Sequence, residues 1–368
     1  MPPVCVMIKP ASGLCNMRCG YCFYADEMGK RGQGSYGIMT EETLECTIRE
    51  ILRFAEGECT LAFQGGEPTL AGLPFFKKCL ELEARYNVNH VRISHSLQTN
   101  GYGLNPEWCR FFARHHFLLG LSIDGTLATH DAYRRDAAGA GTYLKILEAA
   151  KMLEAAGVDF NVLTVVNRRT APKIRHIYEQ YRKLGFRWQQ YIACLDPLGE
   201  EPGKQEYSLL PEAYGRFLID LFDLWYLDFR EGKAPYIRQF ENAIGILMGH
   251  VPESCEQRGT CSHQSVVEAD GSVYPCDFYV LDQYRLGNLR EDGFEALAER
   301  RKELRFVETS FNHTPECRQC QYHPVCRGGC RRHRDQPGQE NYFCRSYRMF
   351  YDACMPRMLE IARMLQRR

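Results

Sequence analysis

The chain has 368 residues, of which 45% are hydrophobic, enough for one large catalytic domain and a smaller appended one. Its 46 basic and 46 acidic side chains cancel, which argues against nucleic acid and against a polybasic membrane surface as partners. Eighteen cysteines without an apolar leader predict reduced thiols in the cytoplasm, and no apolar run reaches the length of a membrane span.

From the start to about residue 195, short apolar runs alternate with amphipathic stretches. The expected strands are Val4–Lys9, Thr60–Gln64, Val91–Gln98, Leu118–Asp124, Phe160–Val166 and Trp188–Cys194. The expected helices cover residues 41–55, 74–86, 106–115, 142–156 and 171–184. This alternation predicts an α/β fold, an open partial (β/α)6 barrel, in which ligands bind at the carboxyl ends of the strands.

The first expected strand leads into a loop with three cysteines, Cys15, Cys19 and Cys22. Because they are separated by three residues and then by two, their thiolates can face a common centre while one coordination position stays open. Structural metal sites are usually closed by protein ligands, so this pattern favours a catalytic iron–sulfur cluster with one open iron. The alternatives are a zinc knuckle or three unrelated thiols.

Glycine and polar residues follow the second and fourth expected strands. The run from Gln64 to Pro68, Gln-Gly-Gly-Glu-Pro, would expose backbone to a ligand, and its Glu67 could accept from an ammonium group. No Lys-Ser/Thr pair follows, so it is not a phosphate loop. Ser122 ends the fourth strand, and the guanidinium of Arg134 suits a carboxylate. Alternatively, these residues form a turn and an ordinary exposed charged pair.

The pattern changes after Cys194. A turn-rich link at 196–203 precedes expected helices over Pro211–Arg230 and 237–248, and a last helix is expected over Tyr347–Leu365. Between them, Asp270-Gly271 predicts a tight hairpin turn within Ser265–Cys276. We therefore expect two domains, one over residues 1–235 and one over residues 236–368.

The second expected domain is rich in cysteine. Eight of its cysteines are enough for two complete four-thiolate sites: Cys255, Cys261, Cys276, Cys317, Cys320, Cys326, Cys330 and Cys344. Two zinc sites that stiffen a loop-rich segment are the alternative. Asp277 directly follows Cys276, where a carboxylate is either a tethered general base or a turn cap. The basic run 331–334 either offsets thiolate charge or is a solvated surface.

The C-x3-C-x2-C spacing at Cys15 resembles the signature of radical S-adenosylmethionine enzymes. The resemblance implies that Cys15, Cys19 and Cys22 hold a [4Fe-4S] cluster whose open iron binds S-adenosylmethionine and releases a 5'-deoxyadenosyl radical. It implies that Gly66 contacts the amino group of the cofactor's methionyl part and that Ser122 and Arg134 bind its carboxylate or ribose. The implied neighbours of the adenine are Tyr21 and Leu195.

The C-terminal cysteines resemble the SPASM extension of radical enzymes, which carries two auxiliary [4Fe-4S] clusters. By that resemblance the first auxiliary cluster is held by Cys255, Cys261, Cys276 and Cys330, and the second by Cys317, Cys320, Cys326 and Cys344. The spacing from Cys330 to Cys344 is shorter than in such enzymes, so Cys354 is the alternative last ligand. The chain is thus expected to carry three [4Fe-4S] clusters.

Further segments narrow the resemblance. The runs at 35–39, 62–73, 96–101 and 275–282 resemble the anaerobic sulfatase-maturating enzymes. Such enzymes oxidise a Cys or Ser in an unfolded or nascent sulfatase, within a Cys/Ser-x-Pro/Ala-x-Arg segment, to Cα-formylglycine. The resemblance implies hydrogen abstraction from the substrate Cβ, deprotonation by Asp277, electron transfer to the first auxiliary cluster and a substrate contact at Gln64. A flavodoxin or ferredoxin is the expected electron donor.

Two other interpretations stay open at this point. A radical enzyme that crosslinks or otherwise modifies a ribosomal peptide would share the same extension. A protein-binding module stiffened by zinc, or an electron carrier without catalysis, would share only the cysteine pattern.

Overall fold

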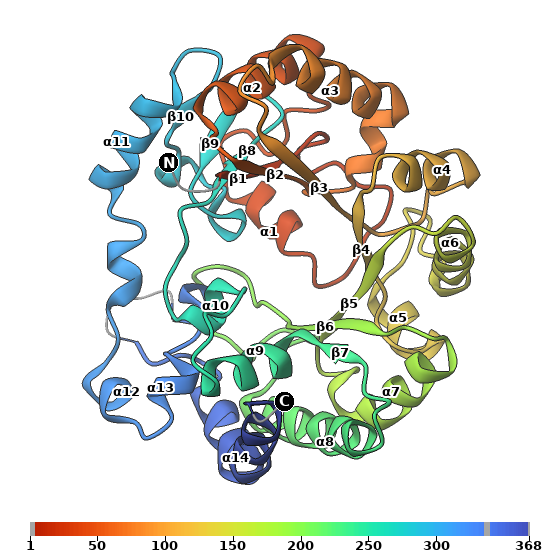
Figure 1. Ribbon diagram of the computed structural model, residues 1–368, viewed down its shortest axis with the longest axis vertical. Helices are drawn as coiled ribbons and strands as arrows, with labels where there is room; N and C mark the ends of the chain where they lie inside the picture. The colour runs from red at the N-terminus through yellow and green to blue at the C-terminus, as the bar shows by residue number, and fades with distance from the viewer. Residues whose placement is uncertain (1–3, 335–338, 367–368) are drawn as a thin grey trace. The chain divides into compact units, whose positions relative to one another are not determined.

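The computed structural model describes residues 4–334 and 339–366, and the chain forms two compact units (Figure 1). The first unit contains Met1–Ser122, Tyr133–Phe160 and His263–Arg305, and the second contains Ile123–Ala132, Asn161–Ser262 and Phe306–Arg368. Both units are therefore built from segments that are distant in the sequence. The domain boundary expected near residue 235 stays a prediction.

The first unit holds a mostly parallel sheet. Its strands, in spatial order, are β10 (Gly287–Asn288), β9 (Ser272–Tyr274), β8 (Ser265–Val267), β1 (Val4–Ile8), β2 (Glu58–Phe63), β3 (Arg92–Thr99) and β4 (Leu118–Ser122). The strands β1 to β4 run parallel, and β8 pairs in parallel with β1, with Met7 opposite Val266. The hairpin predicted around Asp270-Gly271 thus extends the N-terminal sheet, which the sequence did not indicate.

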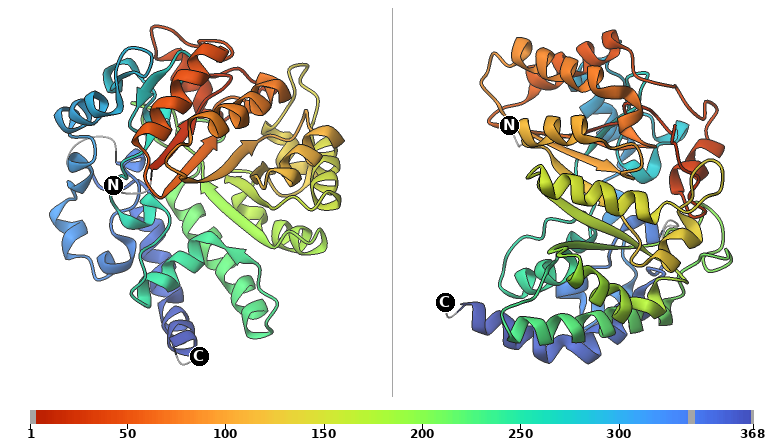
Figure 2. Two further views of the ribbon diagram at one scale, coloured as in Figure 1. Left: turned by 45° about the horizontal axis from the view of Figure 1, so that its top comes forward. Right: turned by 90° about the vertical axis from the view of Figure 1, so that its right-hand side faces the viewer.

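The helices of the first unit bury one apolar face each. Thr40 caps α2 by accepting from the Thr43 N–H, and Leu44, Ile48 and Ile51 on one side of α2 are buried. The helices α2 and α3 lie side by side (Figure 2, left). The helices of this unit are α1 (Phe23–Gly29), α2 (Glu41–Phe54), α3 (Gly72–Tyr86), α4 (Pro106–Arg114), α6 (Tyr143–Ala155) and α11 (Phe294–Leu304).

The second unit combines three parallel strands with a helical, cysteine-rich part. The strands are β5 (Phe160–Val166), β6 (Trp188–Ala193) and β7 (Tyr236–Ile237). The helices are α5 (Leu127–Tyr133), which ends at the unit boundary, α7 (Ile174–Lys183), α8 (Pro211–Arg230), α9 (Arg238–Leu247), α10 (Cys255–Arg258), α12 (Pro315–Gln319), α13 (His323–Cys326) and α14 (Cys344–Gln366). Short 3-10 turns connect several elements in both units.

An aromatic core joins the long helices of the second unit. Helices α8 and α14 run side by side (Figure 2, right), and Phe222 of α8 meets Phe350 of α14 with ring centroids 5.8 Å apart. Phe240 of α9 stacks on the same Phe350, also at 5.8 Å. The burial of these rings in a shared core accounts for the many aromatic residues in the sequence of α8.

All six strands predicted for the first 195 residues are present, with ends that differ by one or two residues at most places. The sequence did not indicate α1, α5 or α11, which are short or weakly amphipathic. Within the described part of the chain, no helix has both the length and the apolar character needed to cross a membrane.

Candidate active site

The three N-terminal cysteines lie in the loop between β1 and α1. The Cys22 N–H donates to the Cys19 carbonyl at 3.2 Å, and the Met17 N–H donates to the Cys15 Sγ at 3.4 Å. All three are free thiols of intermediate exposure. Burial raises the pKa of the Cys15 and Cys22 thiols, so metal binding would have to displace their protons. Three sulfur ligands on one loop fit a cluster that keeps one position for another ligand.

The Gly65-Gly66 turn after β2 packs backbone against backbone on this loop. The Gly66 N–H donates to the Ser12 carbonyl at 2.9 Å, and the Glu67 N–H donates to the Leu14 carbonyl at 2.7 Å. A Cβ at Gly66 would lie only 2.0 Å from the Leu14 oxygen. The close approach therefore requires glycine at this position, beside the cysteine loop. Its predicted contact with the cofactor remains a prediction.

The Glu67 carboxylate has a structural role that the sequence did not indicate. It is fully buried and accepts from the Thr69 N–H at 3.1 Å, the Thr69 hydroxyl at 2.6 Å, the Thr99 hydroxyl at 2.8 Å and the Asn100 N–H at 2.8 Å. These bonds lock together the carboxyl ends of β2 and β3. The suggested role of Glu67 as an acceptor for an ammonium group stays a prediction.

The structure brings together Tyr21 and Arg134, two of the residues predicted to bind the cofactor. The Arg134 Nη1 donates to the Tyr21 hydroxyl at 3.2 Å, and Arg134 is 6% exposed, so it is not part of an exposed charged pair. Ser122, at the carboxyl end of β4, accepts from the Gln98 amide at 2.9 Å. Leu195 follows β6 in the second unit, and its position beside the adenine stays a prediction.

Asp277 lies in a buried cluster of polar groups within the first unit. Its Oδ2 accepts from the Tyr24 hydroxyl at 2.6 Å and from the Gln64 Nε2 at 3.0 Å, and the same Nε2 donates to the Tyr24 hydroxyl at 2.8 Å. Across residues 4–334 and 339–366, no donor reaches the other oxygen, Oδ1. Burial raises the pKa of Asp277, and Lys9 opposes this shift. One carboxylate oxygen is thus held in place while the other can accept a proton.

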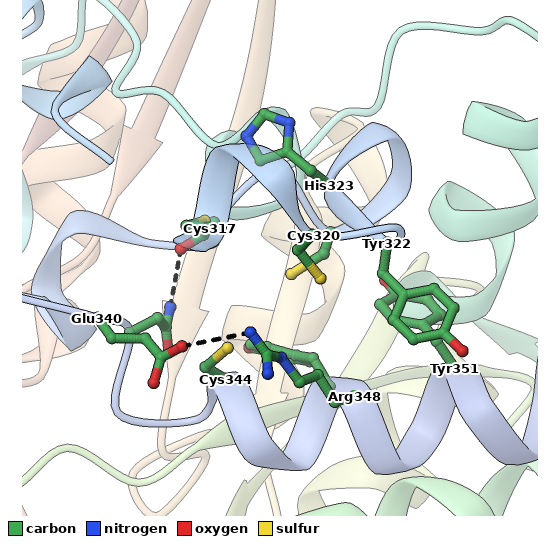
Figure 3. Close-up of a pocket in the computed structure, with 12 residues that line it drawn as sticks. Cys317, Cys320, Tyr322, His323, Glu340, Cys344, Arg348 and Tyr351 are labelled. Atoms are coloured by element: carbon green, nitrogen blue, oxygen red, sulfur yellow. Dashed lines mark hydrogen bonds and ion pairs between the residues drawn. The ribbon is translucent and has the colours of Figure 1, made fainter. Parts of the chain in front are cut away.

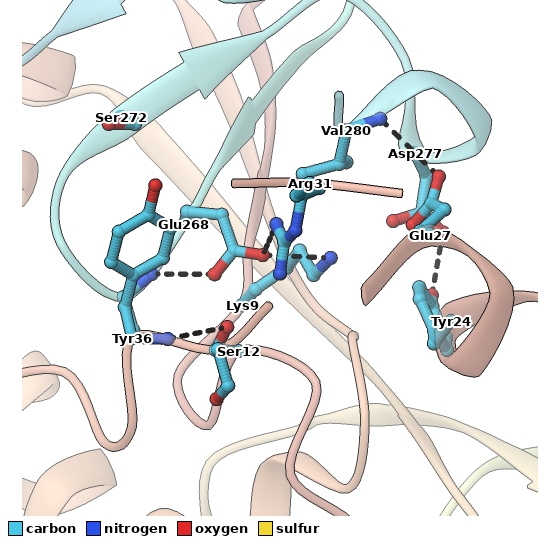
Figure 4. A network of polar contacts seen from close by, with 12 residues as sticks. Lys9, Ser12, Tyr24, Glu27, Arg31, Tyr36, Glu268, Ser272, Asp277 and Val280 are labelled. Atoms are coloured by element: carbon cyan, nitrogen blue, oxygen red, sulfur yellow. Dashed lines mark hydrogen bonds and ion pairs between the residues drawn. The ribbon is translucent and has the colours of Figure 1, made fainter. Parts of the chain in front are cut away.

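Four further ionisable residues form a buried network next to Asp277 (Figure 4), and the sequence did not single them out. Lys9 forms a buried ion pair with Glu268 at 3.0 Å, and Arg31 pairs with the same carboxylate at 2.8 Å. Glu27 accepts from the Val280 N–H at 3.3 Å, and burial raises its pKa to about 8. The one feature of the sequence that pointed to this network was Lys9, a charged residue at the end of an apolar expected strand.

The cysteines predicted for the second auxiliary cluster line one pocket of the second unit (Figure 3). They are Cys317, Cys320, Cys326 and Cys344. Arg348 and Glu340 lie at the same pocket as an ion pair of 3.7 Å. Cys354 does not line this pocket: it is fully buried in α14, where Arg357 contacts its sulfur at 3.6 Å. The geometry therefore favours Cys344 over Cys354 as the fourth ligand.

The ligands predicted for the first auxiliary cluster are divided between the units. Cys255, Cys261 and Cys330 belong to the second unit, where burial raises the pKa of the Cys330 thiol and the charges of Glu256, Cys255 and Cys261 raise it further. Cys276 belongs to the first unit, so its joining them stays a prediction. Arg334, only 7% exposed, interacts electrostatically with Cys330 and Cys261, which supports a charge-balancing role over a solvated one.

One set of residues would also suit a zinc ion. Ligand atoms of His313, Cys317 and His323 all lie within 4.8 Å of one another. Because this set shares Cys317 with the four-cysteine pocket, the two kinds of site exclude each other.

The comparisons with known proteins agree along nearly the whole chain. Residues 10–180 match the radical SAM superfamily, and residues 255–321 match the iron–sulfur cluster-binding SPASM domain. The chain is 44% identical to a cysteine-type anaerobic sulfatase-maturating enzyme of Clostridium perfringens, over 98% of this chain and 99% of that one. It is 33% identical to a serine-type enzyme of Klebsiella aerogenes, over 96% and 86% of the two chains.

A solved structure is also similar to this chain over nearly its full length. The structure of native anSMEcpe with bound AdoMet and Cp18Cys peptide superposes with a TM-score of 0.94 at 44% identity, and the match covers 99% of this chain and 100% of that one. The predicted α/β fold with a C-terminal SPASM segment is therefore confirmed. Sequence identity at this level over the full length decides the family: the chain belongs to the anaerobic sulfatase-maturating enzymes.

Proposed function

We propose that this chain oxidises a cysteine residue of a sulfatase polypeptide to Cα-formylglycine without oxygen. The preference for cysteine rests on identity, because the cysteine-type relatives are 41–44% identical and the serine-type relatives 29–33%. A structure similar to this chain contains both AdoMet and a peptide. The substrate is thus an extended segment of the Cys-x-Pro/Ala-x-Arg kind rather than a folded sulfatase.

The observation that carries the mechanism is the two-sided environment of Asp277. Tyr24 and Gln64 fix Oδ2, and no donor from the described residues occupies Oδ1. When bound, S-adenosylmethionine and the three clusters supply the radical that takes hydrogen from Cβ and the acceptor for one electron. Asp277 takes the thiol proton, so the substrate carbon and sulfur are left as a thioaldehyde, and water converts this to the aldehyde and hydrogen sulfide.

The same proposal assigns roles to the remaining site residues. Cys15, Cys19 and Cys22 hold the catalytic cluster, and Gly66, Ser122, Arg134, Tyr21 and Leu195 bind S-adenosylmethionine. Gln64 contacts the substrate as well as Asp277. A flavodoxin-like or ferredoxin-like protein supplies electrons. The chain divides at residue 235 into a radical domain and a SPASM domain.

The test compares two substitutions of the same chemistry. Asp277→Asn keeps the size of the side chain but removes the base, so it should still cleave S-adenosylmethionine while formylglycine falls by about 100-fold or more. Asp282→Asn alters an exposed aspartate that accepts from the Gly32 N–H at 2.8 Å, outside the cluster around Asp277, and should keep formylglycine formation near the natural rate.

Both variants are reconstituted with iron and sulfide without oxygen, and both receive reductant, cofactor and paired Cys and Ser peptides. Mass spectrometry should show loss of the thiol and gain of a carbonyl in the Cys peptide. Normal formylglycine formation by Asp277→Asn would reject the assigned base, and an intramolecular crosslink instead of a carbonyl would support the alternative of a peptide-crosslinking enzyme.

A further inference from the structure

Asn100 is held by four hydrogen bonds directly beside the cysteine loop. It follows β3 and is 7% exposed. Its backbone N–H donates to Glu67 at 2.8 Å, and its Oδ1 accepts from the Tyr102 N–H at 2.8 Å. Its Nδ2 donates to the Asn16 Oδ1 at 2.8 Å and to the Cys15 Sγ at 3.5 Å. Both the oxygen and the nitrogen of its side-chain amide are therefore hydrogen-bonded.

These contacts leave only one orientation for the amide. The Tyr102 N–H can only donate, so the atom that faces it must be the oxygen of Asn100. The Nδ2 then faces Asn16 and Cys15 with its two hydrogens. One N–H of a buried and rigid side chain thus points at the sulfur of the first cysteine.

An N–H donor near a cluster ligand has a defined electronic effect. A cluster becomes more negative when it accepts an electron, and a hydrogen bond to a ligand sulfur stabilises the more negative state. Such bonds are among the means by which proteins raise the reduction potential of an iron–sulfur cluster. Among the residues that the structure describes, the other donor to the Cys15 sulfur is the Met17 backbone N–H, so Asn100 supplies the donor that a substitution can remove.

We propose that Asn100 is a positioning residue that raises the reduction potential of the catalytic cluster by donating an N–H to the sulfur of Cys15. The proposal rests on the part of the proposed function in which Cys15, Cys19 and Cys22 hold a cluster. It does not depend on the sulfatase substrate. Asn100 makes the cluster easier to reduce and so eases the first step of every turnover.

The test is a redox titration of the reconstituted enzyme, followed by electron paramagnetic resonance without any sulfatase peptide. The signal of the catalytic cluster is identified by its change when S-adenosylmethionine is added. Asn100→Ala removes the donor, and Asn100→Asp replaces it with an oxygen that repels the thiolate. We expect the reduction potential of the catalytic cluster to be highest in the natural chain, lower in Asn100→Ala and lowest in Asn100→Asp.

Tyr102→Phe is the matched control. It deletes a hydroxyl of the same turn that bonds Asp136 at 3.0 Å and Lys145 at 2.6 Å but does not touch Cys15, so the potential should stay unchanged. Equal potentials in all loaded proteins would overturn the proposal. Failure of both Asn100 variants to load iron while Tyr102→Phe loads it would also overturn it, because Asn100 would then serve assembly. A normal potential series without formylglycine formation would reject only the sulfatase function.

Discussion

Two buried carboxyl groups near Lys9 differ in what they bind. Asp277 accepts from two side-chain donors, whereas Glu27 accepts only from the Val280 N–H at 3.3 Å, and no donor of the described residues reaches its other oxygen. Hydrogen-bond donors favour the ionised form of a carboxyl group, so the two donors at Asp277 oppose the rise of its pKa on burial, whereas burial raises the pKa of Glu27 to about 8. Lys9 and Arg31 both form ion pairs with Glu268, and Lys9 also opposes the rise of the Asp277 pKa.

Glu27→Gln should change the pH dependence of stability. Burial raises the pKa of Glu27 from 4.5 to about 8, so the folded chain holds a proton that the unfolded chain releases in this window. Glu27 therefore contributes a loss of stability to the natural chain as pH rises from 4.5 to about 8, and the glutamine variant lacks this contribution. We expect the urea midpoint of the variant to exceed that of the natural chain by an amount that grows as the pH is raised toward about 8. Above about pH 8 the difference between the two midpoints should stay constant. A separation that is constant with pH would contradict this assignment.

At the scale of elements, buried charges fix the hairpin of β8 and β9 to the first strand. Glu268 lies in the turn of the hairpin, and Lys9 follows β1, so their ion pair adds to the strand pairing of Val6 with Ser265. Arg31, just after α1, reaches the same carboxylate. All three side chains are at most 1% exposed, so removal of one partner leaves a charge without compensation in a dry environment.

Glu268→Gln should therefore destabilise the chain by about 3–5 kcal/mol, because two buried cations lose their shared partner. The matched control is Glu58→Gln, which removes an ion pair with Arg92 on two neighbouring strands whose side chains are 56% and 76% exposed. Exposed pairs contribute less than about 1 kcal/mol. Denaturant unfolding of the two variants under one condition measures the difference, and equal losses would show that burial of the Glu268 pair has no special weight.

The same hairpin shows how far the sequence predicts the elements. Its turn is a local signal, so Asp270-Gly271 located it correctly. Its parallel pairing with β1 joins residues about 260 positions apart in sequence, and no local pattern specifies it. Lys9 is buried only because Glu268 arrives from that distance, so the sequence could not assign it a role.

The site shows the same division between local and distant information. The predictions for Cys15, Cys19 and Cys22 rest on their spacing within one loop, and the prediction for Asp277 rests on its position next to Cys276. Tyr24 and Gln64 approach Asp277 from elements that are more than 200 residues away. The saturation of Glu67 by Thr99 and Asn100 similarly depends on the alignment of two strands.

At the scale of the whole molecule, we expect the cysteines to divide into cluster ligands and cysteines without a metal role, several of which are buried. Cys59, Cys79 and Cys109 are at most 2% exposed and lie in strands or helices of the first unit, where burial raises the pKa of each thiol. They stay protonated at neutral pH and serve as small core residues. Iron content should therefore follow the predicted ligands rather than the total number of cysteines.

Cys344→Ala and Cys354→Ala test this division on two cysteines of one helix. Three [4Fe-4S] clusters give about 12 iron atoms per chain. Cys344 lines the pocket with Cys317, Cys320 and Cys326, so its loss should leave about 8 iron atoms. Cys354 contacts Arg357 away from that pocket, so its variant should keep about 12. Iron and sulfide analysis after anaerobic reconstitution measures both, with unfolding midpoints to confirm that each variant is folded. The opposite order, with iron lost only from Cys354→Ala, would assign the fourth ligand to the residue inside α14 and would require that helix to open, since Cys354 is fully buried there.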